Sequence, residues 1–122
     1  IVGIHDAARP MVSVETIKRC FETAAQKGNA IPVINVNESI RVIENNSNKA
    51  VNRSNYKVVQ TPQCFNAAIL KKAFEQDYSS LFTDDASVLE KTGEKIFLVE
   101  GNTENIKITH DTDLILAQHF LK

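Results

Sequence analysis

The order of patterns in the first 35 residues constrains the fold more than any other feature of this sequence. Residues 1–4 (IVGI) form a short apolar run that predicts a buried strand, and residues 30–35 (AIPVIN) predict a second strand. Between them, residues 13–28 carry apolar side chains at helical spacing, namely Val14, Ile17, Phe21 and Ala24. A strand, a helix and a strand in this order predict a right-handed parallel unit, and therefore an α/β fold with a layered sheet.

The same kind of alternation continues after residue 60. Helices are predicted over three further segments: 66–77, 82–93 and 111–122. Side chains that can cap a helix N-terminus stand at the start of three of the four helices: Ser13, Asn66 and Thr83. Glycine is expected to end two of them, at Gly28 and Gly93. Short strands are predicted over 95–101 and 105–109.

Composition and charge exclude several classes of protein. With 122 residues, 43% apolar and 24% charged, the chain has the composition of one ordinary globular domain. Its net charge of −1 offers no field for nucleic acid or a membrane surface, and no apolar run approaches the roughly 20 residues that span a bilayer. The two cysteines, Cys20 and Cys64, are too few for a disulfide scaffold and have no zinc-site spacing. Reduced thiols in the cytoplasm are therefore expected.

Residues 37–59 differ from the rest of the chain, because they are polar, rich in asparagine and contain few β-formers. Within them, the segment ENNSNKA is a cluster of turn-forming residues. We expect a β-hairpin arm that leaves the globular body, with an irregular surface loop as the alternative. An isolated hairpin is marginally stable in water, so the arm should lie on a partner. A second copy of the chain is the expected partner, because two-fold dimers are the commonest oligomers.

Polar side chains end a predicted strand or open a predicted helix in two places. Asp6 and Arg9, in the segment HDAARP, follow the first strand, at the kind of strand end where ligands bind in open α/β sheets. The two residues can pair with each other to shape the turn, or both can face a ligand. Thr83, Asp84 and Asp85 open a helix, where they can cap it or where Thr83 and free N–H groups can hold a phosphate.

Two basic residues stand in segments that could contact an anion. Lys107 lies between two isoleucines in a predicted strand, and strand alternation would leave it alone on its face. Arg53, near the end of the arm, can form a surface ion pair or a forked contact with a phosphate. The histidines form no triad with a nucleophile, so we expect His5 to have a packing or hydrogen-bonding role, and Cys20 to belong to the core.

Taken in order, these segments resemble one enzyme family. HDAARP, NRS (52–54), QTPQ (60–63), TDDAS (83–87) and LVEGN followed by NIKIT (98–109) are similar to the signature of the methylerythritol phosphate cytidylyltransferases. The resemblance covers essentially the whole chain and implies a Rossmann-like nucleotidyltransferase sheet with an inserted dimerisation arm at 37–59. The family's glycine-rich nucleotide loop precedes HDAARP and has no counterpart here. We therefore expect residues 1–122 to be a single partial domain, the substrate-side half of such an enzyme.

The resemblance also implies roles for individual residues. The expected catalytic residues are Asp6, Arg9 and Lys107, and Asp6 is the expected contact to Mg²⁺, directly or through water. The expected contacts to the substrate phosphate are Ser39, Arg53, Thr61, Thr83 and Lys107. In the family the arm arginine reaches the substrate of the partner subunit, and Ser39 retains the hydroxyl of a threonine that assists it.

The implied reaction is cytidylyl transfer from CTP to 2-C-methyl-D-erythritol 4-phosphate with release of pyrophosphate, in non-mevalonate isoprenoid biosynthesis. Two alternatives are kept. The ribitol phosphate cytidylyltransferases carry a similar HDA.RP signature, although TDDAS favours the methylerythritol type. The 122-residue chain alone could instead be a dimerising, sugar-phosphate-binding module, and without the loop for the triphosphate we expect it to be inactive.

Overall fold

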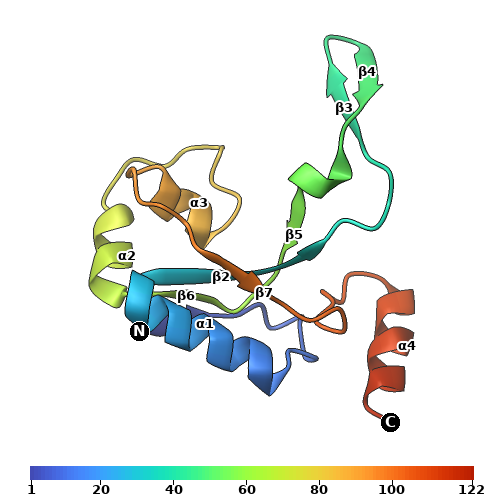
Figure 1. Ribbon diagram of the computed structural model, residues 1–122, viewed down its shortest axis with the longest axis horizontal. Coiled ribbons are helices and arrows are strands. Elements are labelled where there is room, and N and C mark those ends of the chain that lie inside the picture. Colours follow the sequence, from blue (N-terminus) through green and yellow to red (C-terminus); the bar gives the residue numbers. More distant parts are fainter.

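A computed structural model describes residues 1–122 and confirms an α/β fold (Figure 1). The strands of its main sheet are β1 (Val2–Ile4), β2 (Asn29–Asn35), β5 (Lys57–Val59), β6 (Gln63–Phe65) and β7 (Leu98–Glu100). The helices are α1 (Val14–Lys27), α2 (Ala67–Ala73), α3 (Asp85–Glu90) and α4 (Asp111–Phe120). A separate hairpin is made by β3 (Arg41–Glu44) and β4 (Ser47–Ala50), and a 3-10 turn, Arg53–Asn55, follows it. A bilayer-spanning segment is not found among the helices.

Strand β2 is the centre of the sheet. It pairs antiparallel with β6 at its start and with β5 at its end, and parallel with β7. Strand β6 is antiparallel to both β1 and β2. The first strand and β2 therefore run in the same direction, as the strand–helix–strand order predicts, but β6 lies between them.

Helices cover both faces of this sheet (Figure 1). On one face, Ile31 and Phe65 pack with apolar residues of α2 and α3, namely Leu70, Ala73, Ala86, Val88 and Leu89. On the other face, Ala30 and Cys64 pack with Cys20 and Ala24 of α1. Neighbouring strand residues serve opposite cores, because successive side chains point to opposite faces of a sheet.

The first helix has the predicted ends but a different buried face. Ser13 accepts a hydrogen bond from the Thr16 backbone N–H, and Gly28 ends the helix in the left-handed conformation with φ of 95°. Of the predicted apolar face, Val14 is 61% exposed, whereas the fully buried residues include Thr16. The face of α1 that packs against the sheet is Cys20 and Ala24, and Thr16 can lie beside them because its hydroxyl donates to the Asn102 side chain.

Three other expectations are wrong in detail. The strand β1 is not buried: Val2 and Ile4 are 40% and 39% exposed, because β1 pairs with β6 alone. Residues 105–109 form no strand and are tied to the HDAARP segment by one backbone hydrogen bond, from Ile108 N–H to the Ala8 carbonyl at 2.8 Å. The closing helix α4 buries only Ala117.

The polar segment folds as the predicted hairpin and projects from the sheet (Figure 1). Its two-residue turn is Asn45-Asn46, with φ of 47° and 64°. Positive φ at both positions is the geometry that matches the twist of paired strands, and asparagine adopts it at low cost. The irregular-loop alternative is therefore wrong. Ile43, 80% exposed, leaves an apolar side chain on the arm that nothing in this chain covers.

Candidate active site

A pocket of about 400 Å³ collects five of the predicted site residues from four segments of the chain. They are Asp6 and Arg9 after β1, Thr61 between β5 and β6, Thr83 before α3, and Lys107 before α4. Segments that are far apart in sequence meet here because the ends of β1, β5 and β6 lie on one side of the sheet. The structure therefore brings together the residues that the HDAARP, QTPQ, TDDAS and NIKIT segments predict.

The charged groups of this pocket have different degrees of burial. The Arg9 Nε donates to Asp6 Oδ2 at 3.1 Å, and the Arg9 side chain is only 12% exposed. The Lys107 Nζ lies 4.0 Å from the same carboxylate oxygen, but its side chain is 57% exposed. Arg9 therefore has its donors committed inside the protein, whereas the Lys107 ammonium is free to meet an anion. The pairing of Asp6 with Arg9 is confirmed, and because both residues also line the pocket, their contact with a ligand stays a prediction.

The N-terminus of α3 is capped differently from the prediction. Asp84, not Thr83, is the N-cap, and its Oδ1 accepts from the Ser87 N–H at 2.8 Å. The Ser87 hydroxyl accepts from the N–H groups of Thr83 and Asp84. A capping box of this kind satisfies N–H groups that would otherwise be free for a phosphate. The group left to a ligand is the exposed Thr83 side chain.

The pocket also contains residues that were not predicted as site residues, among them Gln63 and Asp85. Gln63 donates to Asp84 Oδ2 at 3.0 Å and accepts from the Ala86 N–H at 3.1 Å, so its buried amide holds α3 against β6. Asp85 faces the pocket with a raised pKa, first because burial disfavours its charge and second because of the neighbouring Asp84 carboxylate. Acidic residues at a helix start are common for capping alone, so the sequence carried no signal that separated Asp85 from that role.

A buried amide network holds three of the loops around the pocket. Gln60 donates to the Asn102 carbonyl at 2.9 Å, and Asn105 donates to the Thr61 carbonyl at 2.8 Å. The Asn105 carbonyl accepts from Arg9 Nη1 at 2.8 Å. Both Gln60 and Asn105 are essentially inaccessible to solvent, at 2% and 0% exposure. The Arg9 guanidinium is therefore held partly by a backbone carbonyl whose own segment is fixed by buried amides.

This network predicts a strict size limit at Gly101. A methyl group there would clash with Gln60 Oε1, so Gly101→Ala should lower the free energy of unfolding by about 1–3 kcal/mol in the complete protein. Urea denaturation measures the change. In a Gln60→Ala background the same methyl no longer meets the Gln60 side chain and has only the Val33 carbonyl oxygen nearby, at 3.3 Å, so its additional effect should be smaller. An equal effect in both backgrounds would mean that the close approach to Gln60 is not the cause.

Ser39 and Arg53 do not line this pocket. Arg53 lies at the base of the arm, where its Nη1 donates to the Asn37 carbonyl at 2.6 Å, and it borders a different cavity with Tyr56 and Lys57. Ser39 is exposed, and its hydroxyl makes no hydrogen bond. Within one chain, the predicted arm residues and the predicted body residues therefore stay apart.

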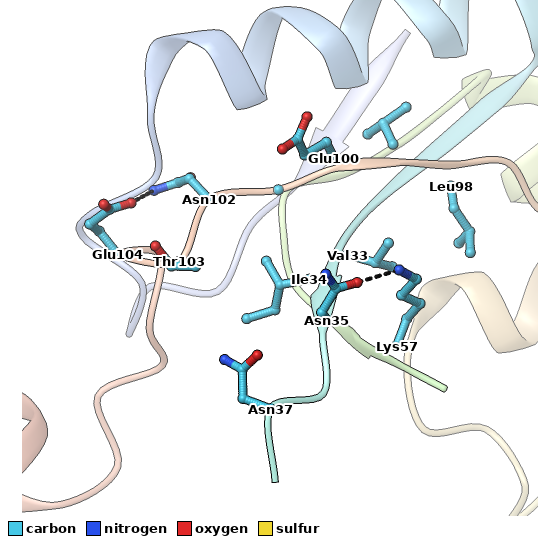
Figure 2. A pocket seen from close by; sticks show the side chains of 12 residues that line it. Val33, Ile34, Asn35, Asn37, Lys57, Leu98, Glu100, Asn102, Thr103 and Glu104 are labelled. Atoms are coloured by element: carbon cyan, nitrogen blue, oxygen red, sulfur yellow. Dashed lines mark hydrogen bonds between the residues drawn. The ribbon is translucent and has the colours of Figure 1, made fainter. Parts of the chain in front are cut away.

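The largest cavity, of about 690 Å³, lies elsewhere, beside the ends of β2 and β7 (Figure 2). Its lining includes the carboxylates Glu100 and Glu104, and its lysine, Lys57, is hydrogen-bonded to Asn35. Its only lysine is engaged, so this cavity offers no accessible cation to a phosphate. The smaller pocket also has carboxylates, those of Asp6, Asp84 and Asp85, but it adds the exposed Lys107 ammonium and collects the predicted site residues, which makes it the better candidate for an anionic substrate.

A comparison with known families tests the resemblance that these motifs carry. The profile of the family described as 2-C-methyl-D-erythritol 4-phosphate cytidylyltransferase matches residues 1–122. The chain belongs to this family. The resemblance carried by HDAARP, QTPQ, TDDAS and NIKIT is thereby confirmed.

Relatives in this cytidylyltransferase family cover the whole chain. The enzymes of that name from Bacteroides fragilis and Porphyromonas gingivalis are 51% and 46% identical over 121 and 122 residues. The alignments include 99% of this chain but 55% of each relative, so the chain spans about half the length of the curated relatives it matches.

Solved structures of the family confirm the nucleotidyltransferase fold. The enzyme from Thermus thermophilus superposes with a TM-score of 0.85 at 36% identity, over 98% of this chain and 60% of that one. The enzyme from Francisella tularensis gives 0.85 at 35% identity, over 97% of this chain and 58% of that one.

Nucleophilic chemistry by cysteine is not supported in this family member. Cys20 and Cys64 are free thiols with no exposed surface. A hydrogen bond with Cys20, together with burial, raises the pKa of the Cys64 thiol. No three histidine, cysteine or carboxylate side chains are grouped as a metal site. Both thiols belong to the core, as predicted for Cys20.

Proposed function

We propose that the complete protein transfers a cytidylyl group from CTP to 2-C-methyl-D-erythritol 4-phosphate and releases pyrophosphate, in non-mevalonate isoprenoid biosynthesis. The observation that carries this proposal is the pocket that joins Asp6, Arg9, Thr83 and Lys107 in a chain whose full length matches the family. The names of its relatives state this activity. We propose a cytoplasmic location, because Cys20 and Cys64 are free thiols and thiols stay reduced in that compartment.

In this reaction a phosphate oxygen of the sugar-alcohol phosphate attacks the α-phosphorus of CTP. The bond from that phosphorus to the bridging oxygen breaks, and pyrophosphate leaves with the electron pair. The attacking oxygen is already anionic, so no protein base is needed. The barrier comes from bringing two anions together, which an exposed ammonium such as Lys107 offsets. The Thr83 hydroxyl, which also lines the pocket, can orient the substrate phosphate.

The acidic side of the pocket fits Mg²⁺ that is held mainly by the nucleotide. Magnesium keeps waters and phosphate oxygens as ligands and commonly takes only one or two protein carboxylates. Asp6 Oδ2 is engaged by Arg9 and Lys107, but Oδ1 has no partner in the protein. Burial raises the pKa of Asp85, and the nearby Asp84 and Asp6 carboxylates raise it further, so negative charge gathers on this side of the pocket. Mg²⁺ bound with CTP would neutralise the triphosphate charge.

We further propose that the arm serves the site of a second subunit. Arg53 and Ser39 stay outside the pocket of their own chain, and the exposed arm has no partner within it. A two-fold dimer would exchange arms and bring both residues to the neighbouring pocket. A guanidinium can then hold the substrate phosphate with two parallel donors.

Mixing variants tests this exchange. Arg53→Ala and Lys107→Ala subunits of the complete protein, each nearly inactive alone, should regain about one quarter of wild-type activity when dissociated, mixed in equal amounts and reassociated. Half of the dimers then carry one variant of each kind, and each of these has one intact site of two. No recovery, in a mixture shown by mass spectrometry to contain mixed dimers, would place both residues in the site of one subunit.

Pyrophosphate release tests the function itself. The complete protein with CTP and Mg²⁺ should release pyrophosphate with methylerythritol phosphate and much more slowly with ribitol phosphate. A preference for ribitol phosphate would keep the fold and mechanism but contradict the proposed substrate. The 122-residue chain, assayed in parallel, should be inactive, and turnover by it would contradict the need for a separate nucleotide loop.

A further inference from the structure

His5 makes two hydrogen bonds that the proposed mechanism does not use. Its Nδ1 lies 2.7 Å from Thr61 Oγ1, and its Nε2 lies 2.9 Å from the Arg9 carbonyl oxygen. The Thr61 hydroxyl oxygen also accepts from the Asp6 backbone N–H at 3.0 Å. The imidazole thus joins the QTPQ segment to both ends of the HDAAR turn.

The direction of each hydrogen bond follows from what the partners can do. A carbonyl oxygen only accepts, so Nε2 carries the ring proton and donates to Arg9. In the neutral imidazole the other nitrogen, Nδ1, is then an acceptor. The Thr61 hydroxyl therefore donates its proton to His5 Nδ1. The same hydroxyl oxygen accepts a hydrogen bond from the Asp6 backbone N–H.

This assignment changes what Thr61 can contribute. A hydroxyl has one proton, and the Thr61 proton is committed to His5. It has no second proton to donate to an anionic phosphate, although Thr61 lines the pocket. Its oxygen instead holds the backbone of Asp6, whose carboxylate pairs with Arg9 and lies near Lys107.

We propose that His5 is a positioning residue: as the Nε2–H tautomer it fixes Thr61 and closes the HDAAR turn, and so aims Asp6 and Arg9 into the pocket. Thr61 then acts through this contact and not as a donor to the substrate phosphate, which differs from its role in the sequence prediction. The kinetic part of the test rests on the proposed function.

Two amide variants separate the two hydrogen bonds. The Asn amide of His5→Asn stands where Nδ1 does and can keep Thr61, whereas the longer His5→Gln side chain can keep the donor to the Arg9 carbonyl. In the complete protein each should lower kcat/KM for methylerythritol phosphate by about 3- to 10-fold, and His5→Ala by about 10- to 100-fold. His119→Gln, on the last turn of α4, is the matched histidine control and should change nothing.

Combining His5→Gln with Thr61→Val distinguishes positioning from direct phosphate contact. Both variants remove the same hydrogen bond, so the loss in the double variant should be smaller than the product of the single losses. If Thr61 instead donated its proton to the phosphate, Thr61→Val would raise KM by the same factor with His or Gln at residue 5, and the two losses would multiply. That result, or a His5→Ala enzyme with unchanged kcat and KM, would overturn the proposal.

A measurement without turnover separates this proposal from the proposed function. Nitrogen-15 NMR of histidine-labelled complete protein, with His5→Gln used to assign the signal, should show an unprotonated Nδ1 at His5 in the neutral ring. Thr61→Val should shift that Nδ1 resonance. An Nδ1–H tautomer, or no shift, would contradict the contact even in an active enzyme. If the protein shows the expected tautomer but does not use methylerythritol phosphate, the contact between His5 and Thr61 is supported and only the proposed function is refuted.

Discussion

Lys107→Ala is expected to lower kcat for methylerythritol phosphate by about 10²- to 10³-fold in the complete protein, the range seen when one oriented charge-stabilising group is lost. The free energy of unfolding should change by no more than about 0.5 kcal/mol. The reason for the difference is exposure: the Lys107 side chain is 57% exposed, and its one charged neighbour, Asp6, lies 4.0 Å away. Little of the fold depends on it, whereas two anions must meet beside it.

Steady-state kinetics and urea denaturation measure these two effects. Lys18→Ala, which removes an exposed lysine of α1 outside the pocket, is the matched control for charge and should leave kcat unchanged. Lys107→Arg keeps the charge and should recover part of the activity. Equal kinetic losses for the Lys18 and Lys107 variants would mean that net charge matters and the pocket position of Lys107 does not.

Arg9→Ala is expected to damage both activity and stability. The guanidinium is 12% exposed and donates to Asp6 Oδ2 and to the Asn105 carbonyl, at 3.1 and 2.8 Å. Its removal leaves a half-buried carboxylate and a buried carbonyl without their partner, which should cost about 2–4 kcal/mol of unfolding free energy. We expect kcat/KM to fall by about 10²- to 10³-fold as well, because the Asp6 carboxylate loses its orientation.

Two variants control for the chemistry of this substitution. Arg9→Lys should recover little, because one ammonium cannot reproduce contacts that a planar fork makes in several directions. Arg19→Ala removes an arginine that also donates to a backbone carbonyl, that of Glu100, but outside the pocket. It should cost about 1 kcal/mol and leave kcat unchanged. A fully stable Arg9→Ala protein would contradict the structural role of the guanidinium.

The local features of this fold could be predicted because they depend on nearby residues. Ser13 and Gly28 bound α1 through contacts within one turn, and Asn45-Asn46 makes the hairpin turn through its own backbone preference. Asp6 and Lys107 could be placed in a common site because the order of their motifs resembles one enzyme family, not because of local spacing.

Features that depend on distant partners could not be predicted. The strands β5 and β6 have three residues each and exist because β2 and β1 pair with them. Residues 105–109 alternate like a strand, yet they lack a partner along their length. Thr16 can be buried because its hydroxyl donates a hydrogen bond to the side-chain oxygen of Asn102, 86 positions later in the sequence. Hydrophobic periodicity contains no information about such polar contacts.

The position of the substrate phosphate in a crystal of the complete protein with methylerythritol phosphate tests the account most directly. We predict the phosphate in the pocket lined by Asp6, Thr83 and Lys107, within hydrogen-bond distance of Lys107 Nζ and of Arg53 from the partner subunit. A phosphate bound in the larger cavity beside Glu100 and Glu104 would contradict it.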